Sequence, residues 1–285
     1  MLKSVLMFAL VSLATTVNNP VLADSLKNST PPRDTEPPAA PLLFTAAPLE
    51  SSQTAAGIYE PIARYLGQAL NRPVVYRYVG NWGVYRTQMQ RGDYDLVFDG
   101  PHFTSYRLEK LRHQLLVRLP DTFQYVTVAR DDFVFVGMQR LYRNNFCAFS
   151  SPNLGTLMLL DLFDNPARQP HITAAASSDE IYQGVVGKRC AAGVLPLAHF
   201  RRLNQDGRVR VLYTSDALPG QALSAGPRVS PDERLQLINA LVSPAASGPT
   251  APLRAAWRTE GGLVRANAED YLPFSRYLRN EWGFY

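Results

Sequence analysis

The chain has 285 residues, of which 46% are hydrophobic and 19% are charged, and its formal net charge at pH 7 is +5. This composition is sufficient for a sizeable core, and it excludes the disordered and collagen-like classes. The small basic excess is spread along the chain, so it favours an anionic ligand only weakly and argues against a nucleic-acid partner.

The first 23 residues have the pattern of a secretory signal peptide. Lys3 is the only charged residue before Asp24, and the apolar run from Val5 to Ala14 is too short to span a bilayer. Val21-Leu22-Ala23 offers a cleavage site, so we expect a cut after Ala23. An uncleaved anchor is the alternative. The sequence therefore predicts a soluble, exported protein.

Residues 24–40 combine prolines with polar side chains, which predicts a disordered linker. Strands and helices are expected to alternate from Pro41 onward. In the first cycle the expected strands are 42–45, 74–79, 95–98 and 115–119. The expected helices are one that follows Ser51 or Ser52 and ends at Asn71-Arg72-Pro73, and those at 81–89 and 102–111. In the first of these helices, Ile58, Ile62, Leu66 and Leu70 form a core-facing stripe, and Ser51 or Ser52 can cap it.

A second cycle is expected after an extended segment at 124–129. Its strands are 146–149, 170–175, 189–195 and 209–214, and its helices are 154–163, 178–186 and 197–203. Ser230-Pro231-Asp232-Glu233 has the form of a capping box and predicts a further helix. The apolar face expected for that helix consists of Leu235, Ile238, Leu241 and Val242. Helices are also expected at 254–259 and 269–282.

Strands that alternate with helices of these lengths predict βαβ units and an α/β fold. Two cycles, joined by the extended segment at 124–129, predict two lobes, each a mostly parallel sheet flanked by helices.

Cys147 and Cys190 are the only cysteines of the chain. In an oxidising compartment an even number of cysteines favours a disulfide. Two buried free thiols are the alternative. Metal binding is disfavoured because no other Cys or His lies near either residue at ligand spacing, and no cofactor is expected.

The stretch from Asp93 to Arg107 carries the clearest signal of a ligand site. Its apolar run ends abruptly at Asp99-Gly100-Pro101 and passes into the helix that begins near His102. Ligands of open α/β sheets bind at this carboxyl edge, and the free N–H groups of a helix start favour anions. An ordinary strand-to-helix turn is the alternative.

From Leu43 to about Tyr271 the sequence resembles the phosphonate-type periplasmic solute-binding proteins, a family that also includes phosphate- and phosphite-binding members. The segments that carry the resemblance, in the family's order and spacing, are 48–70, 91–101, 124–131, 146–156 and 214–241. The resemblance implies a type II periplasmic binding fold, whose two lobes are joined by two hinge strands and close on a ligand by hinge motion. On this basis we place the first lobe at residues 41–126 and 214–285 and the second lobe at residues 127–213. It also implies capture of a small anionic solute, such as a phosphonate- or phosphate-like oxyanion, for an ABC importer.

Several ligand residues of that family are replaced in this chain. Leu49 follows a proline where the family has an aromatic residue, and 153–156 read Asn-Leu-Gly-Thr in place of a Ser/Thr-rich turn. The family's acidic residue that meets an amino group falls near Cys190 or Ala191, and no carboxylate lies between Glu180 and Asp206. These replacements argue against an aminophosphonate.

The candidate ligand-binding residues lie at the starts of predicted helices, where N–H groups and hydroxyls can hold an oxyanion. Turn formation, core packing and helix capping are the alternatives for them. The candidates are Trp82, Gly100, Pro101, His102 and Phe103 in the first lobe, and Ser151, Asn153, Thr156, Ser177 and Ser178 in the second.

No catalytic motif is recognised, since the chain lacks a Gly-x-Ser-x-Gly elbow, a paired-histidine metal motif and a phosphate-binding P-loop. We therefore expect a monomeric binding protein and not an enzyme, with an ABC transporter permease as its partner. A ligand-sensing module of the same fold that reports to a membrane sensor is the alternative.

Overall fold

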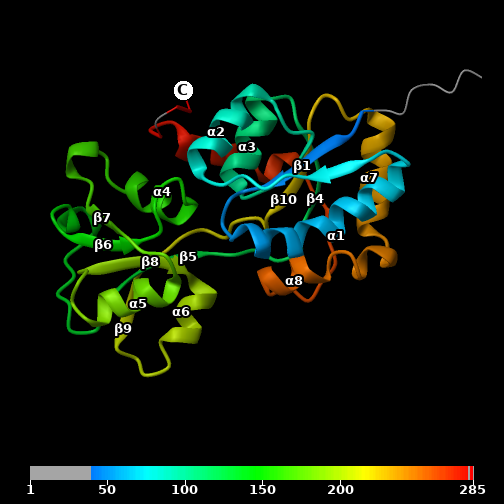
Figure 1. The fold of residues 1–285 in the computed structure, drawn as a ribbon. Coiled ribbons are helices and arrows are strands. Elements are labelled where there is room, and N and C mark those ends of the chain that lie inside the picture. The colour runs from blue at the N-terminus through cyan, green and yellow to red at the C-terminus, as the bar shows by residue number, and fades with distance from the viewer. Residues whose placement is uncertain (1–39, 282, 285) are drawn as a thin grey trace, which may run out of the picture. The chain divides into compact units, whose positions relative to one another are not determined.

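The computed structural model describes residues 40–281, 283 and 284. The predicted signal peptide and all but the last residue of the predicted linker fall outside this part of the chain. Across the described residues, no helix is both long and apolar enough to cross a membrane. The described chain forms two sheets, each flanked by helices (Figure 1).

The first sheet has the strand order β11-β4-β10-β3-β1-β2. Its strands are β1 (Leu42–Ala46), β2 (Val74–Tyr76), β3 (Leu96–Asp99), β4 (Gln114–Arg118), β10 (Ala222–Ala225) and β11 (Val264–Arg265). β1 pairs in parallel with β2 and β3, whereas β10 runs antiparallel to β3 and β4, and β11 runs antiparallel to β4. The sheet is mixed, and the carboxyl ends of β1 and β3 lie at the same edge.

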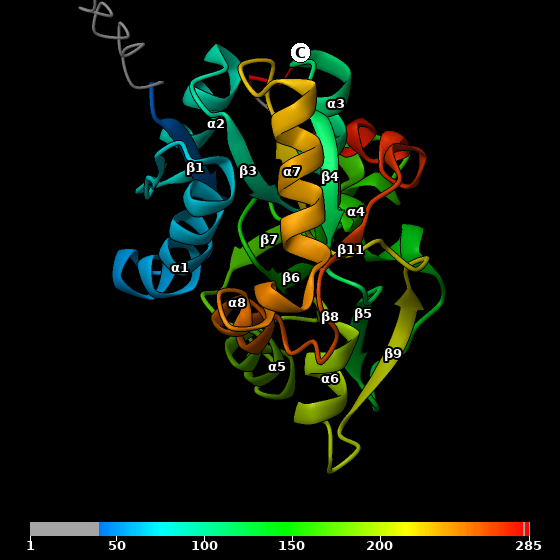
Figure 2. The same cartoon turned by 90° about the vertical axis from the view of Figure 1, so that its right-hand side faces the viewer.

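Helices cover both faces of the first sheet because its central strands alternate apolar side chains between the two faces. Leu42 and Phe44 of β1 pack in one core with α1 (Ser52–Leu70), α7 (Pro231–Val242) and α8 (Ala251–Trp257). Leu43 and Val97 pack in another core with α2 (Trp82–Arg91) and α3 (Pro101–Lys110). Figure 2 shows α7 lying along β4.

The second sheet has the order β7-β6-β8-β5-β9. Its strands are β5 (Tyr125–Arg130), β6 (Asn145–Ala148), β7 (His171–Ala174), β8 (Ala192–Pro196) and β9 (Val209–Thr214). β6 is parallel to β7 and β8, and β5 is antiparallel to β8 and β9. α5 (Ser178–Val186) and α6 (Leu197–Leu203) share a core with Cys147 on one face, and α4 (Leu154–Asp161) packs with Phe146 and Ala148 on the other.

The Cys147 and Cys190 sulfurs are bonded at 2.05 Å, which ties β6 to the segment before β8. Both cysteines are buried. The bond spans 43 positions of the chain, and closing a loop of this length stabilises the fold by about 4 kcal/mol in the chain-entropy model. It therefore holds the parallel strands of the second sheet together.

The C-terminal quarter departs from the predicted elements. β10 and β11 were not expected from the sequence, and the predicted helix 269–282 is instead two 3-10 helices, η4 (Ala268–Asp270) and η5 (Leu272–Leu278). In α7 the buried positions are Leu237 and Leu241, whereas Leu235 is 52% exposed and Val242 is 38% exposed. The predicted apolar face was wrong for these two residues. The side of α7 that packs on the sheet carries Leu237 and Leu241, which are one helical turn apart. The remaining 3-10 helices are η1 (Met138–Leu141), η2 (Pro166–Arg168) and η3 (Pro244–Ser247).

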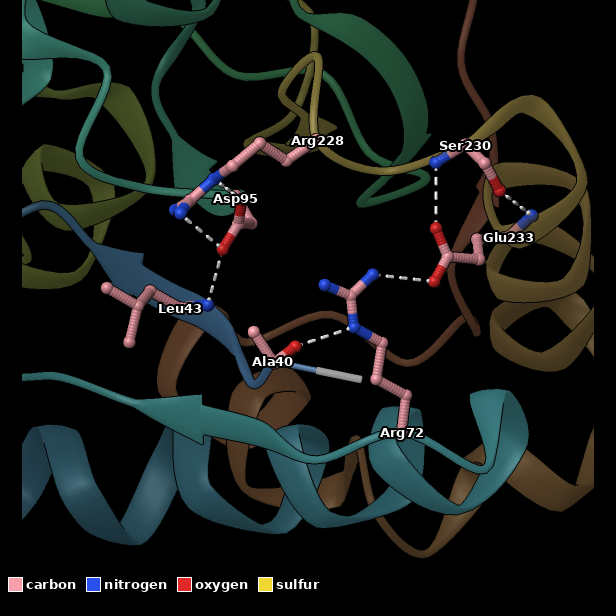
Figure 3. Close-up of polar contacts among 7 residues, drawn as sticks. All are labelled: Ala40, Leu43, Arg72, Asp95, Arg228, Ser230 and Glu233. Carbon is pink, nitrogen blue, oxygen red and sulfur yellow. Dashed lines mark hydrogen bonds and ion pairs between the residues drawn. The ribbon is translucent and has the colours of Figure 1, made fainter. Parts of the chain in front are cut away.

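Two polar networks fix the amino edge of the first sheet (Figure 3). Asp95 is buried before β3 and accepts hydrogen bonds from Leu43 N at 2.7 Å and from Arg228 Nε and Nη2 at 2.7 and 3.0 Å. Glu233 closes the predicted capping box with Ser230 and also binds Arg72 Nη1 at 2.8 Å. A buried carboxylate with three donors is satisfied, so this edge is a structural anchor.

Candidate functional site

A cavity of about 160 Å³ lies where α2, α3 and the loop before α4 meet. Two halves of the chain contribute to it, since α2 and α3 follow strands of the first sheet and the loop follows β6 of the second sheet. The lining residues are Trp82, Gly83, Tyr85, Arg86, Phe103, Ser151, Pro152, Glu281 and Phe284. The cavity is therefore framed by helix starts, an arginine, a glutamate and a wall of aromatic rings.

The helix starts around the cavity differ in how their first N–H groups are satisfied. Asn81 caps α2 by accepting from Val84 N at 3.0 Å, and Asn153 caps α4 by accepting from Gly155 N at 3.0 Å. Gly100 begins α3 without any side-chain cap. The first turn of α3 therefore keeps N–H groups that a ligand or water can bind.

His102 links the first turn of α3 to the loop before α4. Its ring is buried, and Nε2 lies 3.0 Å from the Pro152 carbonyl oxygen. Burial lowers the pKa of His102 to about 4, against a smaller opposing effect of this hydrogen bond. The ring is thus neutral at pH 7 and donates Nε2–H to the carbonyl. His102 holds the two walls of the cavity together and does not itself line the cavity.

Aromatic rings form the wall that α2 and α3 contribute. Phe103 is buried and stacks on Trp82 with ring centroids 5.6 Å apart and an interplanar angle of 21°. Tyr85 meets both rings edge-on, at 5.9 Å from Trp82 and 5.6 Å from Phe103. These offset and edge contacts are the arrangements that aromatic pairs prefer, so the wall is rigid.

Behind this wall a buried ionic network fixes the β3–α3 corner. Arg107 Nε lies 2.5 Å from Asp99 Oδ2 and Arg107 Nη2 lies 3.1 Å from the Tyr85 hydroxyl, which donates to Asp99 Oδ1. Burial, together with the Asp99 charge, raises the pKa of Tyr85 well above its ordinary value. Asp99 raises the pKa of Arg107 despite the opposing effect of burial. The network therefore fixes the hydroxyl end of Tyr85, a residue that lines the cavity.

The predicted residues of the second lobe do not all lie at the cavity. Ser151 lines the cavity. The Thr156 hydroxyl donates to the Phe149 carbonyl at 2.6 Å, so it closes its own turn. Ser177 caps α5 by accepting from Glu180 N at 3.1 Å, and the Ser178 hydroxyl lies 2.7 Å from His199 Nδ1.

Among the ten predicted residues, the cavity thus brings together Trp82, Phe103 and Ser151. Gly100, Pro101 and His102 form the adjoining start of α3, Asn153 and Thr156 shape the start of α4, and Ser177 and Ser178 belong to the start of α5. The sequence analysis missed Gly83, Tyr85, Arg86, Pro152, Glu281 and Phe284. Tyr85 and Arg86 follow Trp82 by three and four residues, so helical spacing could have placed them on the same face of α2. No local signal could have brought Glu281 and Phe284 to the same place.

The sequence from residue 44 to residue 271 matches the family described as "ABC transporter, phosphonate, periplasmic substrate-binding protein". The chain belongs to this family. Its members are periplasmic substrate-binding proteins of ABC transporters and not enzymes. A search of curated proteins finds no match.

Solved structures share the fold of this binding protein at low sequence identity. PhnD1 from Prochlorococcus marinus in complex with methylphosphonate is 14% identical, with a TM-score of 0.64, and the match covers 84% of this chain and 97% of that one. XAC2383 from Xanthomonas citri bound to ATP is 13% identical, with a TM-score of 0.67 and the same two coverages. A binding protein component of an ABC phosphonate transporter from Pseudomonas aeruginosa is 13% identical, with a TM-score of 0.59, covering 83% of this chain and 85% of that one. These likenesses establish a type II periplasmic binding fold.

Proposed function

We propose that the protein captures a small anionic solute, a phosphonate- or phosphate-like oxyanion, in the cavity between α2, α3 and the loop before α4, and delivers it to an ABC importer. The observation that carries the proposal is the composition of this cavity. Arg86 and Ser151 line it, and the uncapped start of α3 adjoins it through the lining residue Phe103.

Each of these groups favours an oxyanion for a physical reason. A guanidinium forms charge-assisted hydrogen bonds to phosphoryl oxygens, and a hydroxyl can donate another. A helix start without a cap leaves N–H donors at the positive end of the helix dipole. A volume of about 160 Å³ suits a solute of a few heavy atoms.

Membership in the family supports delivery to an ABC transporter permease, because family members serve that transport. Methylphosphonate, the ligand in the complex of the Prochlorococcus marinus protein, is compatible with the size of the cavity. Periplasmic export of this chain, with a cut after Ala23, is part of the same proposal.

Isothermal calorimetry with methylphosphonate, phosphate, phosphite and methanesulfonate tests the proposal, together with native mass spectrometry of freshly purified protein. We expect saturable one-to-one binding of at least one of these anions and a rise in melting temperature, since a ligand that binds only the native state stabilises it. Arg86→Ala should weaken that binding, and Arg64→Ala, on the exposed face of α1, is the matched control. Absence of binding by all four anions would refute the proposal.

A further inference from the structure

The described residues of the C-terminal segment, 272–281, 283 and 284, lie beyond the family-matched residues, yet Glu281 and Phe284 line the cavity. Its first part, η5, packs against α3. The Ser105 hydroxyl donates to the Leu272 carbonyl at 2.8 Å, and the Ser275 hydroxyl donates to the Glu109 carboxylate at 2.8 Å. Both hydrogen bonds join the segment to the outer side of α3.

The other side of η5 packs against α4. Tyr277 contacts the apolar cluster that contains Leu154 and Met158 of α4. It also contacts the cluster that contains Leu278 and Leu157 together with the aromatic wall. The segment therefore joins α3 of the first sheet to α4 of the second beside the cavity.

The end of the segment is held in place by packing on the aromatic wall. The Phe284 ring is buried, 5.9 Å from the Phe103 ring and 5.3 Å from the Tyr106 ring. The Gln90 side chain donates to the Gly283 carbonyl. These contacts place Glu281 and Phe284 among the lining residues.

Glu281 changes the charge that a solute meets. Among the described residues that line the cavity, Arg86 and Glu281 are the two that carry a charge, and their charges are opposite. An oxyanion with one negative charge can bind the guanidinium and keep its uncharged end toward the carboxylate. A dianion must also place negative charge near that carboxylate, and like charges repel strongly where solvent is partly excluded.

We propose that Glu281 is a specificity-determining residue that makes the cavity prefer a solute with one negative charge over a dianion. This proposal rests on the proposed function, because it assumes that the solute occupies this cavity. It also gives the C-terminal segment a role that the family-matched part of the chain does not supply.

Sulfate and methanesulfonate are the matched probes, because both are tetrahedral sulfur oxyanions and they differ by one charge. Their dissociation constants are measured by calorimetry, directly or by competition with methylphosphonate, for the wild-type protein, Glu281→Gln and Glu260→Gln. Glu260 is an exposed carboxylate that does not line the cavity, so it controls for net charge.

The wild-type protein is expected to bind methanesulfonate more tightly than sulfate. In Glu281→Gln the preference for methanesulfonate should fall about tenfold, the size of effect that one unit charge has at a distance of several ångströms in a partly solvated site. Glu260→Gln should keep the wild-type preference. Glutamine retains the shape of the side chain, so the melting temperature should stay close to that of the wild type.

If the wild-type protein binds methylphosphonate but Glu281→Gln leaves the ratio of the two dissociation constants unchanged, the charge selection is overturned and the proposed function stands. Tighter binding of sulfate than of methanesulfonate by the wild type has the same consequence. If the wild type binds none of the anions, the proposed function fails and this inference fails with it.

Discussion

In acid, His102 is expected to lower the free energy of unfolding of the wild-type protein by about 3 kcal/mol. Replacing His102 with glutamine should remove this part of the pH dependence. Burial lowers the pKa of His102 to about 4 in the folded state, whereas an unfolded histidine titrates near 6.5. Between these two values the unfolded chain binds more protons than the folded one. The free energy of unfolding must therefore fall as the pH falls from about 6.5 through about 4.

The magnitude follows from the difference between the two pKa values. Each unit corresponds to about 1.4 kcal/mol, so a shift of about 2.5 units gives about 3 kcal/mol. Above about pH 6.5 both states hold a neutral ring, and His102 makes no pH-dependent contribution there. Glutamine cannot titrate in this range, and its amide can still donate to the Pro152 carbonyl.

Urea unfolding at several values from about pH 7 to about pH 4 measures the effect. His113 is also buried, and burial together with Arg107 and Arg234 lowers its pKa to about 2. It destabilises the wild type and the His102→Gln variant alike in acid, so the difference between their two curves isolates His102. The exposed His171 provides the control variant His171→Gln, whose curve should follow that of the wild type.

A wild-type curve that runs parallel to the His102→Gln curve across this range would refute the reasoning. It would mean that the ring of His102 protonates equally well in the folded and unfolded states. The burial that lowers the pKa of His102 in the folded state would then be contradicted.

Three further predictions concern the scaffold around the cavity. Asp99→Asn should lower the free energy of unfolding by about 3–5 kcal/mol in urea unfolding, because it leaves a buried guanidinium without its counter-charge; a loss below about 1 kcal/mol would contradict this burial. Replacing Cys147 and Cys190 together with alanine should cost about 4 kcal/mol by the same measurement, since the unfolded chain loses its loop constraint; an unchanged stability would argue against that account. A Cβ added at Gly155 would lie 2.4 Å from the Tyr125 ring, so Gly155→Ala should shift the start of α4. We expect the free energy of unfolding to fall by about 1–3 kcal/mol and the affinity for methylphosphonate in calorimetry to weaken. Wild-type stability and affinity in this variant would count against the tight contact.

Much of the secondary structure follows from local sequence signals. Ser51 and Ser230 cap α1 and α7 through the hydrogen bonds that their side chains offer. Gly92 ends α2 at a φ of 70°, a left-handed conformation that glycine adopts without strain. Signals of this kind act within one turn of the chain, so they can be recognised before the fold is known.

The strands that were missed depend on distant partners. β10 has the sequence Ala-Leu-Ser-Ala, which carries little strand propensity, and it exists because β3 and β4 pair with it on both sides. β11 has two residues and is defined only by its pairing with β4. The mixed character of the first sheet arises from β10, which follows the second sheet in the chain, and from β11, since both run antiparallel to β4.

The sequence by itself determined the alternation of strands and helices, the family, and the abrupt end of β3 at Gly100-Pro101, where α3 begins. These features depend on propensity, capping and local order, which neighbouring residues decide. Only the tertiary structure decided that Arg86, Ser151 and Glu281 line one cavity and that Asp99 binds Arg107 behind it. Such contacts depend on how separate elements pack in three dimensions, and no spacing along the chain encodes the position of a C-terminal glutamate beside α2.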